Sequence, residues 1–329
     1  MKVAVIGTTA WGTALGIMLA RGSTDVALWA RTEEEAERLE SDRENVARLS
    51  GVAFPDTLSA TASMADALTD ASLVILAVPS QQMRHNVRLV KEHLSQPVPI
   101  LSVAKGLEKE TTKRMSQVIA EELGPPFHDR ICTISGPNFS REIARGLPAA
   151  TVLASPNGAA TQTVHKVLSG PSFRVEMSGD MVGVELAGAL KNVIALGAGM
   201  LDALGYGDNA KAAFVSRGYQ EITRLAIAAG ADPDTFAGLA GIGDLVATCS
   251  SPLSRNRTFG AELAKGRSPE DIQSSMTSVV EGIATAAAAL KLAHALGVQV
   301  PITEQLHRVL FEGFDLVTAM EQLALGGGV

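Results

Sequence analysis

Short apolar runs alternate with helix-like stretches through the first half of the chain. The runs typical of strands cover residues 2–6, 26–29, 73–78, 100–103 and 131–135. Because they are apolar throughout, they predict a parallel sheet covered on both faces. Helical stretches lie between them, at residues 11–21, 33–40, 81–93 and 111–123. This alternation predicts right-handed βαβ units in a doubly wound, mostly parallel sheet, which residues 150–154 and 173–176 would extend.

The pattern changes near residue 180 and becomes helical to the end. Alanine- and leucine-rich stretches with helical spacing cover residues 182–204, 211–229, 234–239, 257–265, 281–296 and 301–311. Glycines and the pairs Asp232-Pro233 and Ser268-Pro269 separate these stretches, and such pairs suit helix starts. We therefore expect two closely packed domains, an α/β domain at 1–180 and an all-α domain at 181–329, with a ligand cleft between them. Residues 326–329, rich in glycine, are expected to be disordered.

Composition narrows the classes of protein. A formal charge of −7 over 329 residues argues against a nucleic-acid partner. Two cysteines far apart fit a reducing compartment, and six scattered histidines give no metal-site pattern. The uncharged run after Lys2 resembles a signal peptide, but glycines and threonines interrupt it. Lys191 and Lys291 interrupt the two most apolar helices, so we expect no membrane span and a cytoplasmic protein.

The first predicted strand leads into a turn that resembles a dinucleotide fingerprint. It runs from Gly7 to Gly12 and then enters a helix, whose N-terminal amides would hold a pyrophosphate. Thr9 stands where the middle glycine of G-x-G-x-x-G normally lets the backbone approach the phosphates. An ordinary strand-to-helix turn is the alternative interpretation. If the fingerprint holds, the domain is of the Rossmann type.

The second strand is followed by Arg31 instead of the acidic residue that usually holds the adenosine ribose of NAD. An arginine at this position suits the 2′-phosphate of NADP. We therefore predict that NADP(H) is preferred and NAD(H) is also accepted. A solvated surface arginine is the alternative.

Three charged residues are candidates for chemistry. Lys105 follows a strand end beside a glycine, and Asp244 follows the run Gly238–Gly243. Lys191 lies in an otherwise apolar helix, where a lysine is costly to bury unless it is paired or functional. Burial and a nearby cation would lower its pKa toward a catalytic range. Lys105 as a surface lysine and Lys191 as a snorkelling one are the alternatives.

Residues Ser254, Arg255 and Asn256 form a candidate anion site. They are expected to open a helix, so a phosphate could accept hydrogen bonds from the arginine and from the helix N–H groups together.

Six motifs in order resemble the bacterial NAD(P)-dependent glycerol-3-phosphate dehydrogenases. They are Gly7 with Trp11-Gly12-Thr13-Ala14-Leu15, Ala104-Lys105-Gly106-Leu107-Glu108, Ser135-Gly136-Pro137, Glu185-Leu186-Ala187-Gly188-Ala189-Leu190-Lys191-Asn192-Val193, Gly205-Tyr206-Gly207-Asp208-Asn209-Ala210-Lys211-Ala212 and Ser251-Pro252-Leu253-Ser254-Arg255-Asn256. The resemblance extends from Met1 to about Phe314. It implies a Rossmann-type domain, a helical domain and reduction of dihydroxyacetone phosphate to sn-glycerol 3-phosphate, which feeds phospholipid synthesis. The reaction requires no metal, and a homodimer is one quaternary state that stays open.

The resemblance also implies roles for individual residues. Lys191 would be the proton donor and acceptor, with Lys105 and Asp244 as further catalytic residues. The implied substrate contacts are Lys105, Gly136, Asn138, Lys191, Asp244, Ser254, Arg255 and Asn256. The implied cofactor contacts are Gly7, Ala10, Trp11, Gly12, Arg31, Lys105, Ser140, Arg255, Val279 and Glu281.

Four positions depart from the family pattern, where position 9 is usually glycine, positions 10 and 138 serine, and position 140 alanine. This chain has Thr9, Ala10, Asn138 and Ser140. We expect Thr9 to keep a negative φ, with its hydroxyl bonded to a phosphate oxygen or to the helix start. Two other functions stay open: a reductase of another 2-keto or 3-hydroxy acid, and a non-catalytic dinucleotide sensor.

Overall fold

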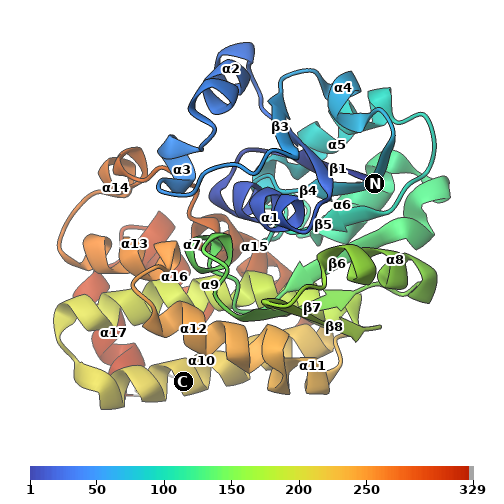
Figure 1. The fold of residues 1–329 in the computed structure, drawn as a ribbon. Helices are drawn as coiled ribbons and strands as arrows, with labels where there is room; N and C mark the ends of the chain where they lie inside the picture. Colours follow the sequence, from blue (N-terminus) through green and yellow to red (C-terminus); the bar gives the residue numbers. More distant parts are fainter. Residues whose placement is uncertain (326–329) are drawn as a thin grey trace. The chain divides into compact units, whose positions relative to one another are not determined.

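The computed structural model describes residues 1–325, so the disorder expected at 326–329 lies outside the described residues. The chain forms two compact units (Figure 1). The sheet unit contains Met1–Ala104 and Met115–Met181. The helical unit contains Lys105–Arg114 and the chain from Val182 onward.

One eight-stranded sheet organises the sheet unit, in the order β3-β2-β1-β4-β5-β6-β7-β8. All neighbours are parallel except β6 and β7, which are antiparallel. The first six strands have the order of a Rossmann-type sheet. The strands are β1 (Lys2–Ile6), β2 (Asp25–Trp29), β3 (Leu58–Thr61), β4 (Ala71–Leu76), β5 (Ile100–Ser102), β6 (Ile131–Ser135), β7 (Ala149–Ala154) and β8 (Phe173–Ser178).

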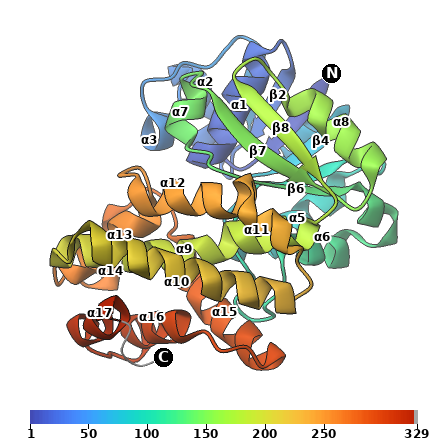
Figure 2. The same ribbon diagram turned by 90° about the horizontal axis from the view of Figure 1, so that it is seen from below.

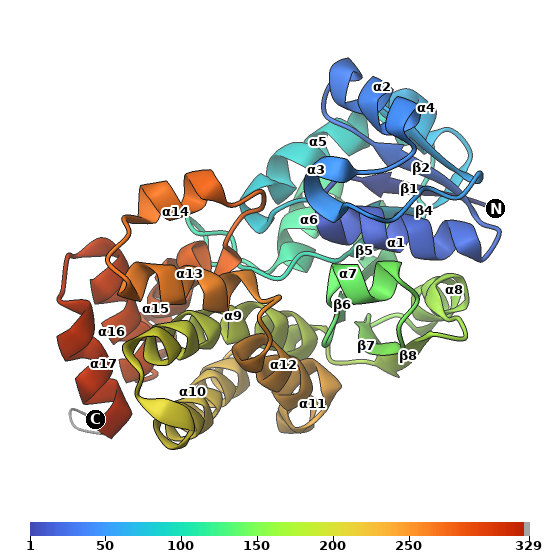
Figure 3. The same ribbon diagram turned by 60° about the vertical axis from the view of Figure 1, so that its left-hand side comes forward.

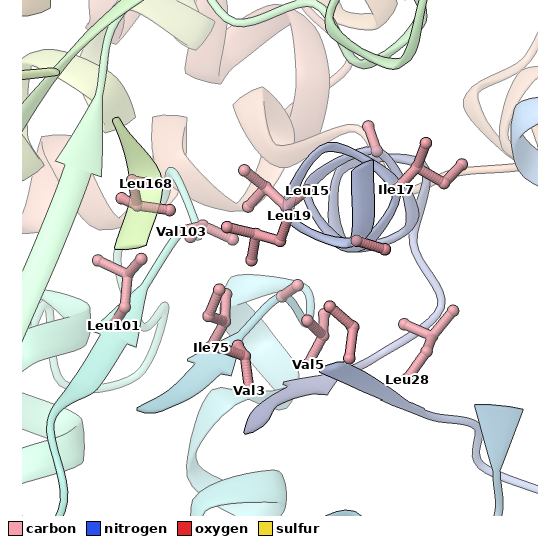
Figure 4. Packing of buried hydrophobic residues seen from close by; sticks show 14 of the residues in the cluster. Val3, Val5, Leu15, Ile17, Leu19, Leu28, Ile75, Leu101, Val103 and Leu168 are labelled. Carbon is pink, nitrogen blue, oxygen red and sulfur yellow. The ribbon is translucent and has the colours of Figure 1, made fainter. Parts of the chain in front are cut away.

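Helices cover both faces of this sheet, which explains why central strands such as β1 and β4 are almost wholly apolar and buried. On one face, α1 (Ala10–Arg21) packs Leu15 and Leu19 over Val5 and Ile75 (Figure 4). This face also carries α3 (Val46–Leu49), α7 (Ser140–Ala144) and α8 (Gly158–Leu168). Figure 3 shows α7 and α8 beside the β6–β8 end of the sheet. On the other face lie α4 (Met64–Leu68), α5 (Met83–His93) and α6 (Met115–Leu123). Helix α2 (Glu33–Asp42) packs against the edge strand β3.

The helical unit is built around α9 (Met181–Leu204), in which every residue from Gly183 to Leu201 is buried. By length and composition α9 could span a membrane, but 89% of its most apolar window is buried in the protein, as in a core helix. Helix α15 packs on α16, and α10 packs on α17 (Figure 2). The other elements are α10 (Gly207–Ala228), α11 (Pro233–Ala237), a π-helical turn (Leu239–Gly243), α12 (Asp244–Ser250), α13 (Arg255–Ala264), α14 (Pro269–Ser275), α15 (Glu281–Leu296), α16 (Pro301–Phe311) and α17 (Leu316–Leu325).

The segment Lys105–Arg114, which we call the lysine loop, belongs to the helical unit although it lies between β5 and α6 in the sequence. Leu107 is fully buried in the helical core. The Glu108 amide bonds the Lys113 carbonyl at 2.9 Å, and Thr112 adopts φ 61°. The prediction of a helix from residue 111 was therefore wrong at its start, since α6 begins at Met115.

Candidate active site

The turn after β1 depends on two glycines. Gly7 has φ 109°, and a Cβ there would lie 2.9 Å from the Ala77 carbonyl oxygen. A Cβ on Gly12 would collide with the Gly7 carbonyl oxygen. Both glycines are therefore needed to bring the start of α1 close to the strand ends. The Ala10 and Trp11 amides precede the first helical hydrogen bond, from Thr13 N to Thr9 O, so they suit a pyrophosphate.

Thr9 fits this turn without strain. It has φ −60° and ψ 160°, and its hydroxyl accepts a hydrogen bond from the Gly12 amide at 3.1 Å. The same hydroxyl donates to the Ala77 carbonyl at 2.8 Å. The expected negative φ is confirmed, and of the two expected partners the helix start is the one observed. Thr9 therefore caps α1 and ties the turn to the end of β4.

Gly136, Asn138 and Ser140 lie at the carboxyl end of β6 and at the start of α7, in the sheet unit. The Asn138 side chain donates to the Ala150 carbonyl at 3.0 Å and accepts from the Thr151 hydroxyl at 3.0 Å. Both ends of this amide therefore fasten the loop to β7. A substrate contact by Asn138 stays a prediction.

Three of the predicted residues meet in the helical unit. Lys191 of α9 is 5% exposed, and its Nζ donates to Asp244 Oδ1 at 2.6 Å. Lys105 of the lysine loop donates to the other oxygen, Asp244 Oδ2, at 2.8 Å. Asp244 is 1% exposed and begins α12, directly after the π-helical turn. One buried carboxylate thus holds two ammonium groups.

This arrangement sets the protonation of both partners. Burial lowers the pKa of Lys191 to about 8; the charge on Lys105 adds to this effect, and the Asp244 carboxylate opposes it. Burial alone would raise the pKa of Asp244, but the two lysines outweigh burial and hold that pKa below its usual range. At neutral pH the site therefore contains a carboxylate and an ammonium group that can release its proton.

Side-chain amides fix the surroundings of the lysines. Asn192 donates to the Lys105 carbonyl at 3.1 Å and accepts from Asn256 Nδ2 at 2.8 Å. Asn256 Oδ1 in turn accepts from the Gly282 amide at 2.9 Å. This chain of hydrogen bonds joins the lysine loop, α9, α13 and α15. One N–H and the oxygen of the Asn256 amide thus take part in holding these elements together.

The start of α13 lies close to α9. A Cβ on Gly199 would collide with the Arg257 carbonyl, and one on Gly260 with the Leu196 carbonyl, so the two helices touch through their backbones. Ser254 caps α13 by accepting from the Arg257 amide at 3.3 Å. Arg255 is exposed at the first helical position. An exposed guanidinium beside helix N–H groups is a suitable arrangement for a phosphate.

A buried ion pair fastens the far end of the lysine loop. Arg114 Nη1 lies 2.6 Å from Glu185 Oε2, and the glutamate side chain is 4% exposed. Leu107, Asn192 and this pair together hold the loop on the helical unit, which fixes the position of the Lys105 backbone.

The remaining predicted cofactor residues belong to different units. Arg31 is exposed after β2 in the sheet unit. Val279 is 49% exposed, and Glu281 begins α15; both belong to the helical unit. Among the described residues, no group of three or more histidine, cysteine or acidic side chains could hold a metal ion.

Sequence reasoning missed Thr248 and Asn192. The Thr248 hydroxyl accepts from Lys191 Nζ at 2.6 Å. Thr248 lies one helical turn after Asp244, so a prediction of α12 would have placed the two on the same face. Asn192 carried a signal only as the neighbour of Lys191.

A Rossmann-type sheet with a glycine-containing turn after its first strand, and a buried lysine–carboxylate cluster, are features of nicotinamide-dependent oxidoreductases. Two family models match: NAD-dependent glycerol-3-phosphate dehydrogenase N-terminus over residues 2–161, and its C-terminus over residues 180–321. The chain belongs to the NAD-dependent glycerol-3-phosphate dehydrogenase family.

Curated relatives and a solved structure are similar over almost the whole chain. A glycerol-3-phosphate dehydrogenase [NAD(P)+] of Dehalococcoides mccartyi is 48% identical over 98% of this chain and 90% of its own. One from Pelotomaculum thermopropionicum is 45% identical over 99% of this chain and 93% of its own. The crystal structure of the Coxiella burnetii glycerol-3-phosphate dehydrogenase has a TM-score of 0.93 and 34% identity, over 98% of each chain.

Proposed function

We propose that the chain catalyses the NAD(P)H-dependent, reversible reduction of dihydroxyacetone phosphate to sn-glycerol 3-phosphate, the precursor of phospholipids. The observation that carries this proposal is the buried Lys105–Asp244–Lys191 cluster in a member of this family. The α13 start supports a phosphorylated substrate.

A bound nicotinamide would supply a hydride to the ketone carbon. Gly7, Gly12 and the amides of Ala10 and Trp11 would hold the pyrophosphate of the cofactor. As negative charge develops on the carbonyl oxygen, the Lys191 ammonium would donate its proton to that oxygen and become a neutral amine. Hydride and proton together give the secondary alcohol.

The neighbours of Lys191 make this proton transfer feasible. A pKa of about 8 keeps most of the lysine protonated at neutral pH but lets it lose the proton readily. Lys105 would stabilise the developing oxyanion. The Lys191 ammonium donates hydrogen bonds of 2.6 Å each to Asp244 and Thr248. These two bonds fix the orientation of its third N–H, which would carry the transferred proton.

The phosphate would bind at the start of α13. The Arg255 guanidinium and the backbone N–H groups near Asn256 can bind a dianion there by donating hydrogen bonds to it. Ser254, the N-cap of α13, fixes the conformation of this turn. Holding the phosphate would orient the ketone and supply binding energy for catalysis.

A cytoplasmic location is part of this proposal, supported by two cysteines that are both unpaired and buried. A homodimer stays a prediction.

Turnover tests the proposal. Purified protein is assayed for NADPH and NADH oxidation with dihydroxyacetone phosphate, dihydroxyacetone and an unphosphorylated 2-keto acid, with Lys191→Ala as the matched control. We expect turnover only with the phosphate ester. Equal turnover of the keto acid would indicate a different reductase. Dinucleotide binding without any turnover would indicate a sensor.

A further inference from the structure

Glu35 links the two turns that follow β1 and β2. Its Oε1 accepts a hydrogen bond from the Thr8 hydroxyl at 2.6 Å, and its Oε2 accepts from the Arg31 amide at 3.4 Å. Thr8 is 7% exposed and follows Gly7 in the phosphate-binding turn. The carboxylate is therefore directed toward that turn.

Capping of helix α2 does not explain these two hydrogen bonds. Thr32 caps α2 by accepting from the Glu35 amide at 3.2 Å, so Thr32 and Glu35 have the spacing of a capping box. In a capping box the glutamate side chain returns to the amide of the cap residue itself. Here the carboxylate hydrogen bonds go to Thr8 and Arg31 instead, which places it between two strand ends.

That place is where a Rossmann-type site binds the adenosine ribose. Strands β1 and β2 are parallel neighbours, with Ile6 opposite Trp29, so the segments after them meet at the same sheet edge. An acidic residue after β2 binds the ribose hydroxyls of NAD, whereas an arginine there binds the 2′-phosphate of NADP. This chain has both residue types, Glu35 and the exposed Arg31, within one short segment.

We propose that Glu35 is a specificity-determining residue that opposes Arg31. Its carboxylate has about four acceptor positions, so the bonds from Thr8 and Arg31 leave room for a ribose 2′-hydroxyl. The same negative charge repels a 2′-phosphate, which the Arg31 guanidinium attracts. The two residues together would let the site accept both cofactors. This inference rests on the proposed function, because it requires a dinucleotide in the turn.

Binding of cofactor fragments tests the inference without turnover. Calorimetry measures Kd for 5′-ADP, adenosine 2′,5′-bisphosphate, NADH and NADPH. With Glu35→Gln we expect the 2′-phosphorylated ligands to bind about tenfold tighter and NADH about tenfold weaker. Arg31→Ala should weaken only the 2′-phosphorylated ligands. Glu34→Gln, on the same exposed helical turn, controls for the change in net charge.

A specificity role predicts that Glu35→Gln changes the affinities for NADPH and NADH in opposite directions, whereas a structural role predicts the same direction for both. Glu35→Gln variants that change both cofactors in the same direction, or that match Glu34→Gln, would overturn the inference and leave the proposed function standing. Failure of the wild-type protein to bind any dinucleotide or fragment would overturn the proposed function, and the inference with it.

Discussion

Replacing Asp244 by asparagine should destabilise the protein in a manner that depends on pH. The carboxylate accepts hydrogen bonds from Lys191 at 2.6 Å and Lys105 at 2.8 Å, and its side chain is 2% exposed. Asparagine keeps the shape but leaves a buried ammonium without a counter-charge. Breaking a buried ion pair in this way costs about 3–5 kcal/mol. That is a large share of the roughly 5–15 kcal/mol by which proteins are usually stable.

The pH dependence follows from Lys191. Without Asp244, burial and Lys105 still lower the pKa of Lys191, so in the variant it falls below the wild-type value of about 8. As pH rises through this lowered pKa, the folded protein loses the buried charge while the unfolded lysine, with a pKa of about 10.4, stays protonated. The unfolded state then binds more protons, so stability rises with pH. The cost of the substitution should therefore be large near pH 6 and small near pH 9.5.

Denaturant unfolding, followed by circular dichroism at both pH values, measures this cost. Lys191→Met in the Asp244→Asn background should recover most of the lost stability, because the unpaired charge is removed. Asp202→Asn is the matched control: Asp202 also holds two cations, Lys211 at 2.9 Å and Arg257 at 2.7 Å, but is 24% exposed. We expect it to cost about 1 kcal/mol or less. A loss for Asp244→Asn that is equal at both pH values and is not relieved by Lys191→Met would refute the reasoning.

Three further predictions concern turnover and cofactor binding. Lys191→Ala should lower kcat by ~10²–10⁴-fold. In the wild type, the rate of ketone reduction should fall as the pH rises through about 8, because Lys191 then loses the proton that it donates, while the rate of alcohol oxidation should rise. Thr9→Gly removes the cap of α1, so we expect about 1 kcal/mol or less of lost stability by thermal unfolding and a change in cofactor KM of less than about tenfold. Glu185→Gln breaks the buried pair with Arg114, which should loosen Lys105 and lower kcat by about tenfold or more in steady-state assays.

Each of these predictions has a clear contrary result. A Lys191→Ala enzyme with more than about a tenth of wild-type kcat would exclude the proton-donor role. Cofactor affinity a hundredfold higher in Thr9→Gly would mean that threonine obstructs the natural site. For the loop, Glu110→Gln is the control, because Glu110 lies 4.0 Å from Lys291 and is 81% exposed. Equal kinetics of Glu110→Gln and Glu185→Gln would contradict an anchoring role for the buried pair.

Strong local patterns made most of the fold predictable. Continuous apolar runs correctly predicted β1, β2, β4, β5 and β6, because strands buried on both faces carry few polar positions. Strands β7 and β8 were correctly predicted as extensions of that sheet. Strand β3 was missed, since only Leu58 of its four residues is fully buried and the strand includes serine and threonine. Seven helices were also missed, namely α3, α4, α7, α8, α12, α14 and α17. All of them except α8 and α17 have seven residues or fewer.

The site was predictable only as far as single residues stand out from their surroundings. Lys191 stood out because a charge in an apolar helix is unusual. Its contact with Thr248 spans 57 positions, and the Arg114–Glu185 pair spans 71, so neither leaves a local pattern. The start of α6 was also not predictable, because Thr112 adopts φ 61° and nothing in the residues around it indicates this conformation.

The lysine loop limits how this chain could be recombined with its relatives. A crossover at Met181 exchanges most of the two units, but it separates the lysine loop from α9. Leu107, Arg114 and Lys105 would then come from one parent, and the helical core, Glu185 and Asp244 from the other. Substitutions in the lysine loop and in α9 are therefore expected to be inherited together. A functional chimera would need two more crossovers, one on each side of Lys105–Arg114.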